Sequence, residues 1–135
     1  MQQVTQTYDI WTFRDRSELG SNVMETHADI SGFHVEALDG SIGKVDEATY
    51  DVGRSHIVVD TGPWIFGKKV ILPGGIVTGI DETEEQVFVN RTKEQIKNAP
   101  EFDEARFAEE DYRATIGSYY GPGGSAYRDW DQNGS

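Results

Sequence analysis

The sequence predicts a mainly β protein: a small six-stranded β-barrel, a short helix after the last strand, an acidic C-terminal helix and flexible ends. Short apolar runs recur at intervals of roughly ten residues between positions 31 and 91, and glycine, proline and aspartate separate them. The densest apolar stretch, residues 53 to 75, is cut into two strands and a turn. Its 135 residues, 36% of them apolar and 15 of them glycine, suit one domain with loose ends.

The first two predicted strands form a hairpin. Phe33, Val35 and Ala37 alternate with polar residues, as in a strand with one buried face. Residues 39 to 41, Asp-Gly-Ser, are typical of a tight hairpin turn that needs left-handed backbone. The second strand then continues through residues 43 to 52.

The next two strands are the most apolar. Residues 56 to 59 are a nearly continuous β-branched run, which predicts a strand buried inside the sheet. Trp64 and Phe66 form an aromatic corner before the strand at residues 68 to 72, which Pro73 ends. A turn is an unusual place for large aromatic side chains, so we expect them to plug one end of the barrel or to meet a partner. The plug is the favoured interpretation.

Two further strands and a helix complete the predicted barrel. The strands lie at residues 76 to 80 and 86 to 90, on either side of the acidic loop at 81 to 85. Thr92 and Gln95 have the spacing of a capping box, which predicts a short helix ending before Pro100.

A second helix is expected at residues 103 to 116. Ala105, Ala108, Tyr112 and Tyr119 form an apolar stripe at helical spacing on an acidic surface. A lone helix of this length is marginal in water, so the stripe must cover its own barrel, a second copy or another protein. The sequence does not decide among these three.

The ends of the chain lack a sustained period and define the domain boundaries. Trp11 and Phe13 share a parity, so the N-terminal segment could lie extended against the barrel, and a docked and a disordered arm are both consistent with the sequence. The predicted units are a flexible arm (1–30), a barrel domain (31–103), a C-terminal helix (104–120) and a disordered tail (121–135).

Composition restricts the classes of function. The chain contains no cysteine, which excludes disulfides, thiolate nucleophiles and cysteine metal sites. It shows neither a signal peptide nor an apolar run of membrane-spanning length, so we expect a cytoplasmic protein without membrane insertion. The net charge of −12 makes a nucleic-acid partner unfavourable, and Lys68 and Lys69 are interpreted as a solvated strand edge.

Candidate catalytic and ligand motifs are incomplete. Gly40 and Gly43 are separated by two residues where a phosphate loop needs four, so this segment is interpreted as a hairpin. His27, His34 and His56 lack metal-site spacing, and the acidic loop at 81 to 85 lacks the pattern of a calcium loop. No serine lies in a nucleophile elbow. We therefore predict no catalytic residue, no cofactor and no bound metal.

Three segments carry a resemblance to a known family. GFHVEALDGSIGKVDEATYD, IVVDTGPWIFGKKVILP and VNRTKEQIKNAPEFD together resemble the PRC-barrel domain over residues 31 to 103, most closely its small stand-alone bacterial members. The resemblance implies a six-stranded barrel like those of the photosynthetic reaction centre H subunit and of the C-terminal half of the ribosome maturation factor. Those relatives are assembly and binding modules without catalytic residues to carry over.

The resulting functional prediction is a non-catalytic PRC-barrel module for protein–protein interaction or assembly. Its partner is another protein or a second copy, with a dimer as the expected oligomer. An RNA- or ribosome-associated accessory protein and a small enzyme of unknown reaction are the alternatives. The predicted interaction surface comprises Trp64, Phe66, Tyr112, Ile116, Tyr119 and Tyr120.

Overall fold

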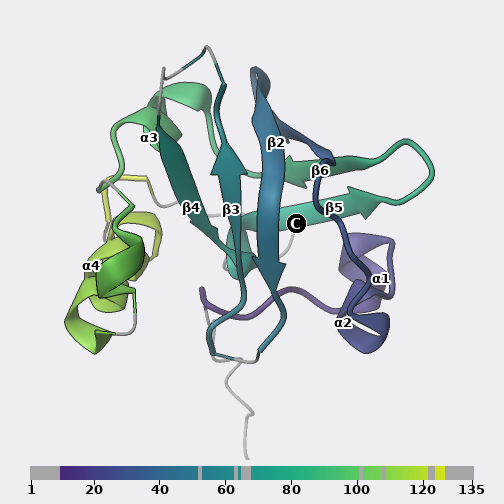
Figure 1. The fold of residues 1–135 in the computed structure, drawn as a ribbon, viewed down its shortest axis with the longest axis horizontal. Coiled ribbons are helices and arrows are strands. Elements are labelled where there is room, and N and C mark those ends of the chain that lie inside the picture. The colour runs from purple at the N-terminus through teal and green to yellow at the C-terminus, as the bar shows by residue number, and fades with distance from the viewer. Residues whose placement is uncertain are drawn as a thin grey trace, which may run out of the picture.

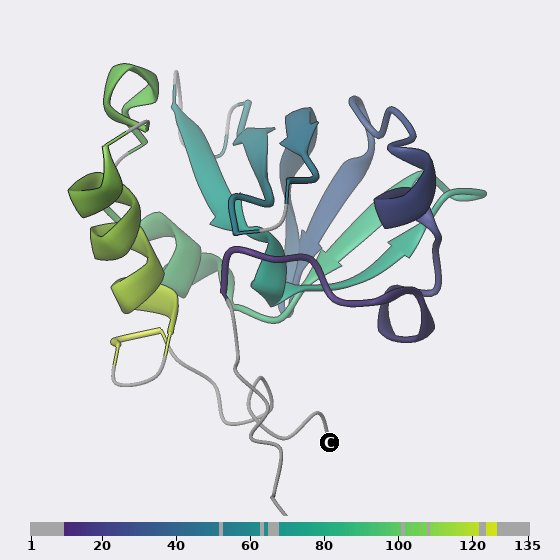
Figure 2. The same cartoon turned by 90° about the horizontal axis from the view of Figure 1, so that it is seen from below.

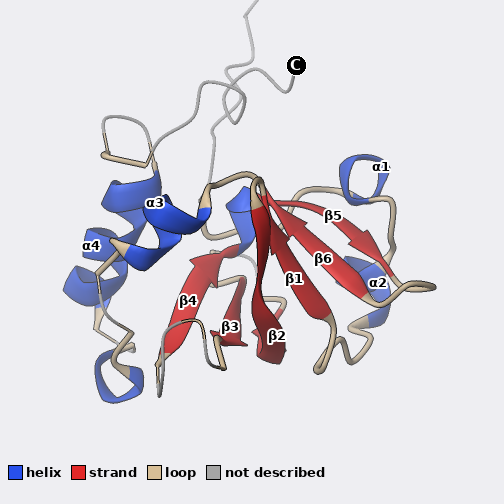
Figure 3. Cartoon of the chain, turned by 90° about the horizontal axis from the view of Figure 1, so that it is seen from above, coloured by secondary structure: helices blue, strands red, loops and turns tan. Residues whose placement is uncertain are grey.

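Six strands form one mixed sheet in the computed structural model of the chain. The model describes residues 10–51, 53–62, 64, 68–100, 102–107, 109–121 and 124–126. The strands are β1 (His34–Ala37), β2 (Gly40–Thr49), β3 (His56–Asp60), β4 (Lys69–Pro73), β5 (Val77–Asp81) and β6 (Gln86–Val89). Their order is β4-β3-β2-β1-β6-β5, and Figure 3 shows them side by side in a curved layer. All neighbours are antiparallel except β1 and β6, which are parallel.

The sheet is open where the prediction was a closed barrel. All six predicted strands are present, which confirms the mainly β class and the strand count. Within the described residues, however, β4 and β5 do not pair with each other. The chain passes between these two strands through a short 3-10 turn, η1 (Gly74–Ile76), whose three residues are buried. The seam between β4 and β5 is therefore covered by other segments instead of by a ladder.

Helices lie at both ends of the curved sheet (Figures 1 and 3). Beside β5 are two four-residue helices, α1 (Arg16–Leu19) and α2 (Val23–Thr26). Toward β4 lie α3 (Lys93–Lys97), the 3-10 turn η2 (Glu104–Arg106) and α4 (Glu110–Tyr120). No helix in the described part of the chain is long and apolar enough to cross a membrane.

The N-terminal segment is part of the core, which corrects the prediction of a flexible arm from residue 10 onward. Figure 2 shows this segment crossing beneath the strands. The buried apolar side chains that it contributes are Trp11, Phe13, Leu19, Val23 and Ile30. These five anchors lie before the sequence-based boundary at residue 31, because their irregular spacing shows no period; their packing is the docked arrangement that the sequence left open.

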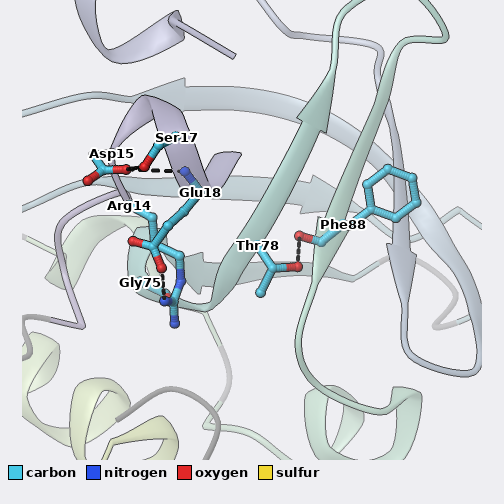
Figure 4. A network of polar contacts seen from close by, with 7 residues as sticks. All are labelled: Arg14, Asp15, Ser17, Glu18, Gly75, Thr78 and Phe88. Carbon is cyan, nitrogen blue, oxygen red and sulfur yellow. Dashed lines mark hydrogen bonds and ion pairs between the residues drawn. The ribbon is translucent and has the colours of Figure 1, made fainter. Parts of the chain in front are cut away.

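Backbone hydrogen bonds fix this segment over the seam. The Ser55 N–H donates to the Trp11 carbonyl at 2.7 Å, and the Gly75 N–H donates to the Ile10 carbonyl at 2.8 Å. The Arg14 guanidinium adds a bond from Nε to the carbonyl of Gly75 at 3.0 Å, drawn in Figure 4. The arm is thus bonded to Ser55, just before β3, and to η1, the turn that joins β4 to β5.

The short helix after β6 forms as predicted. The Thr92 side chain accepts a hydrogen bond from the Gln95 N–H at 3.1 Å, and the Gln95 side chain accepts one from the Thr92 N–H at 2.9 Å. This reciprocal pair is the capping box that the spacing predicts. The Asp39 carboxylate in the β1–β2 turn accepts from the Lys93 N–H at 2.8 Å and ties α3 to the hairpin.

The C-terminal helix begins seven residues later than residue 103, at Glu110. The Asp103 carboxylate accepts from the Ala105 N–H at 3.1 Å, which favours the separate 3-10 turn at Glu104–Arg106. Of the predicted stripe, Ala105 is exposed and Ala108 lies outside the described residues. The apolar face of α4 instead packs on the domain's own core, which is one of the three arrangements left open by the sequence.

Part of the predicted disordered tail is also ordered. Ala126 is fully buried, and its N–H donates to the Tyr119 carbonyl at 3.0 Å. The remaining predicted tail residues, apart from Gly121, Gly124 and Ser125, lie outside the described part of the chain.

Candidate interaction surface

An exposed phenylalanine stands on the outer face of β6. Val87 and Val89 point into the core and are 0% and 2% exposed, whereas Phe88 between them is 38% exposed. Alternation along a strand requires this arrangement, because two core residues at i and i+2 place the residue between them on the opposite face. Phe88 and Leu38, which is 51% exposed, are the large apolar side chains that the described residues leave in solvent.

The strand register places Phe88 in a row with a carboxylate and a glycine. Glu36 on β1 pairs with Phe88, and Phe88 pairs with Gly79 on β5. A Cβ atom at Gly79 would lie 3.5 Å from Cδ2 of Phe88, so the ring rests over a position that has no side chain. Thr78 Oγ1 donates to the Phe88 carbonyl at 3.4 Å, and Figure 4 shows the ring projecting away from this bond.

Two open hollows adjoin the Phe88 ring, one toward the β1–β2 turn and one toward α1. The first, here called the Leu38 hollow, has a volume of about 510 Å³. It is lined by Glu36, Ala37, Leu38, Gly40, Thr78, Gln86, Phe88 and Val89. Leu38 leaves the sheet directly after β1, and its N–H donates to the Arg91 carbonyl at 2.9 Å, which holds the turn in place.

The second hollow, here called the Glu82 hollow, also has a volume of about 510 Å³. It is lined by Leu19, Gly20, Gly79, Ile80, Asp81, Glu82, Thr83 and Phe88. Ser21 Oγ donates to Glu82 Oε1 at 3.0 Å and so links the segment after α1 to the β5–β6 loop. We call the two hollows with the shared Phe88 ring the Phe88 face.

Trp64, the aromatic residue singled out by the sequence, lies elsewhere. Its side chain is half-buried, and Lys93 Nζ lies 5.5 Å from the centre of its ring, within the range of a cation–π contact. A smaller hollow of about 340 Å³ is lined there by Trp64, Lys93, Glu94, Lys97 and Asn98. Trp64 is thus only partly buried, whereas the favoured interpretation was a side chain that plugs one end of the barrel. Phe66 lies outside the described residues.

Three residues of the predicted interaction surface lie in the core. Tyr112, Ile116 and Tyr120 are buried, and the Tyr112 hydroxyl accepts a hydrogen bond from the Asp103 N–H. Tyr119 is half-buried, and its hydroxyl donates to the Gln95 carbonyl at 2.7 Å. These aromatic side chains attach α4 to its own domain, so in this conformation they offer no common surface to a partner.

Sequence reasoning did not identify Phe88 and Leu38. The signal was present, because Val87 and Val89 share a parity and Phe88 has to face the other way. The residues of the incomplete phosphate-loop motif form the β1–β2 hairpin, as the sequence interpretation has it. Gly43 has a φ of 146°, and a Cβ atom there would overlap the Asp60 carbonyl oxygen of β3.

Histidine and tyrosine side chains with shifted pKa values belong to the core. Burial beside Trp11 and Phe107 lowers the pKa of His56 below its ordinary value of 6.5, against the raising effect of its hydrogen bond to the Arg54 carbonyl at 2.7 Å. Burial raises the pKa of Tyr50 to about 12, and the Tyr50 hydroxyl donates to the Ala28 carbonyl at 2.7 Å. The described residues contain no group of three or more acidic or histidine side chains able to hold a metal ion.

Comparison with solved structures shows a weak structural likeness to a ribosomal RNA processing protein. A crystal structure described as a 16S ribosomal RNA processing protein, RimM, from Pseudomonas aeruginosa matches 57% of this chain. The two share 22% sequence identity with a TM-score of 0.40, and the match covers 48% of the RimM chain, about half its length. No protein-family model matches the sequence, and no curated protein matches it either. A likeness at this level does not show a shared function.

Proposed function

We propose that this chain is a non-catalytic module of the PRC-barrel type that docks a protein partner on the Phe88 face. The supporting observation is the joint exposure of Phe88 and Leu38, at 38% and 51%, beside one hollow. The family motifs in residues 31 to 103 and the six-stranded sheet are consistent with such a module.

Burying the Phe88 face would favour association. Single apolar residues scattered over a surface are common, but Phe88 and Leu38 line the same hollow. Removing apolar area from water contributes about 25 cal/mol per Å², and aromatic anchors in small hollows dominate the energetics of many interfaces. Phe88 is held on a strand inside the sheet, between β1 and β5, so little conformational entropy remains to be lost on binding.

The Phe88 face contains few side chains that could take part in a chemical reaction. Its only ionisable lining residues are the carboxylates Glu36, Asp81 and Glu82. A cytoplasmic location and the absence of catalysis remain part of this proposal.

Affinity capture from the native host tests the proposal. The tagged full chain is compared with the variant Leu38→Ser/Phe88→Ser, and bound proteins are quantified by mass spectrometry. The variant Trp64→Ala is the matched control, because it also removes an aromatic surface group but lies outside both hollows. We expect at least one protein to be lost with the double variant and retained with the control. Identical captured sets for the wild type and the double variant would contradict the proposal.

An RNA- or ribosome-associated role is the second candidate, and the Trp64 hollow favours it. An aromatic ring can stack a base while the Lys93 and Lys97 ammonium groups contact phosphates. Glu94 in the same hollow and the net charge of −12 act against this mode of binding. The RimM chain is described in this class of function, but its likeness is too low to decide between the two candidates.

Single-stranded oligonucleotide binding tests the second candidate. Fluorescence anisotropy with a labelled oligouridine at low and physiological salt compares the wild type with Trp64→Ala/Lys93→Ala. Binding that depends on salt and is lost in this variant but retained in Leu38→Ser/Phe88→Ser would support an RNA-associated role. No binding at low salt would exclude the Trp64 hollow as a nucleic-acid site.

A further inference from the structure

We infer that the occupant of the Phe88 face is a basic protein segment that carries an apolar residue for the Leu38 hollow. This inference rests on the proposed docking function and specifies the chemistry of the partner. Three features of the face lead to it: the exposed apolar side chains of the Leu38 hollow, the sign of the charges that line both hollows, and the charge of the rest of the chain.

The exposed apolar side chains lie at the Leu38 hollow. Phe88 lines both hollows and Leu38 lines the first, and these two side chains are 38% and 51% exposed. Leu19 and Ile80, which line the Glu82 hollow, are only 2% and 3% exposed. A segment crossing the face would therefore place an apolar side chain in the Leu38 hollow, against Leu38 and Phe88, and polar or charged residues in the Glu82 hollow.

The charges of the lining are of one sign. Glu36 lies in the Leu38 hollow, and Asp81 and Glu82 lie in the Glu82 hollow, whereas neither lining contains lysine, arginine or histidine. Asp81 also begins the exposed β5–β6 loop, which adds Glu84 and Glu85. An acidic segment would meet like charges in both hollows, while lysine or arginine would meet a carboxylate in each.

Bases near the face lie outside the hollows. His34 lies two residues before Glu36 on β1 and pairs with Lys44 on β2. Neither residue lines a hollow. Lys93 approaches the Gly40 end of the Leu38 hollow, where a Cβ atom on Gly40 would lie 3.5 Å from its Cδ. The Glu82 hollow is thus the more acidic of the two, and the strongest attraction for a basic residue is expected there.

The overall charge disfavours the other occupants. A second copy of the chain would bring another net charge of −12 toward the same acidic face. A nucleic acid would bring phosphates toward Glu36, Asp81 and Glu82. A basic protein segment is attracted both at long range by the whole chain and at contact by the three carboxylates.

Two synthetic peptides provide the test. Both have the same length and the same leucine positions, and the polar positions are lysine in one and glutamate in the other. Each is titrated into the ¹⁵N-labelled full chain, and amide chemical shifts report the binding site. The charge variant Glu36→Gln/Glu82→Gln removes one carboxylate from each hollow. The control Glu110→Gln/Asp111→Asn removes the same charge from the exposed first turn of α4.

We expect the lysine peptide to shift amides of β1, β5 and β6, and the glutamate peptide to shift none. The charge variant should weaken binding of the lysine peptide roughly three- to tenfold, which is about 0.6 to 1.4 kcal/mol in total for two rim ion pairs, and the α4 control should weaken binding less than about twofold. The effect of the charge variant should shrink as salt is raised.

Several results would overturn the inference. The basic character of the partner would be wrong if both peptides bound the face equally, or if the charge variant and the α4 control weakened binding equally. The site would be wrong if the lysine peptide bound outside β1, β5 and β6, or did not bind at all. Capture from the native host separates this failure from that of the proposed function. If Leu38→Ser/Phe88→Ser still loses a protein there, the docking role stands and only the basic character of the partner is wrong.

Discussion

The backbone N–H of Gly75, in the turn that joins β4 to β5, donates a 2.8 Å hydrogen bond to the carbonyl oxygen of Ile10. The two segments approach so closely that a Cβ atom at Gly75 would lie 2.8 Å from that oxygen. The neighbouring Gly74 is equally restricted, since a Cβ atom there would lie 3.0 Å from the Phe13 nitrogen. The two glycines of η1 therefore allow the arm to close the open side of the sheet.

The first prediction concerns this close approach. Gly75→Ala should lower the free energy of unfolding by roughly 1 to 3 kcal/mol, because the added methyl group pushes the arm away from the seam. Gly79→Ala is the matched control, since its Cβ atom would make an ordinary 3.5 Å contact with Phe88. Urea denaturation of both variants and of the wild type measures the difference in unfolding free energy. Equal stability of Gly75→Ala and the wild type would show that the arm does not close the seam.

The second prediction separates core from surface aromatic residues. Trp11 is buried, with its ring 5.6 Å from that of Phe107 and 6.3 Å from that of His56. Trp11→Ala should therefore cost about 3 to 5 kcal/mol of unfolding free energy. Phe88→Ala should cost less, about 1 kcal/mol, because Phe88 is 38% exposed on the outer face of the sheet whereas Trp11 is buried in the core. If chemical denaturation gave the reverse order, the assignment of the arm to the core would be wrong.

The third prediction is a pH dependence of stability. Burial lowers the pKa of His56 in the folded state below the ordinary value of 6.5, so the unfolded chain takes up the proton more readily. The contribution of neutral His56 is fully present above pH 6.5 and is lost as the pH falls through the folded-state pKa. The unfolding free energy of the wild type should thus decrease between pH 7 and 5 more steeply than that of His56→Gln.

Urea denaturation at several pH values measures this difference. Above pH 7 the two proteins should show the same slope of stability against pH, because the histidine is neutral in both states there. A steeper loss in His56→Gln than in the wild type on acidification would contradict the assigned direction of the shift.

Most of the sheet could be predicted from the sequence, because strand periodicity and turn residues are local signals. The alternation of Phe33, Val35 and Ala37 and the turn at residues 39 to 41 predict β1 and β2, and the capping box at Thr92 predicts α3. These elements depend on residues that are close together in the chain, and a sequence pattern can detect them.

Features that depend on distant contacts could not be predicted. The packing of the N-terminal segment on the core is one such feature, because Trp11 and Leu19 show no period that would place them there. The burial of three residues of the predicted interaction surface could not be predicted for a related reason. Tyr112 and Tyr120 are apolar anchors on a helix, and the sequence cannot say whether such a face covers its own domain or a partner.

Site-specific photo-crosslinking in the native host is the most direct test of the Phe88 face as a docking surface. A photoreactive phenylalanine analogue replaces Phe88 in one protein and Trp64 in another, and adducts formed in cells are identified by mass spectrometry. The account predicts a discrete protein adduct from position 88 that disappears when Leu38→Ser is added, and no such adduct from position 64. Adducts from position 64 alone, to protein or to RNA, would contradict it.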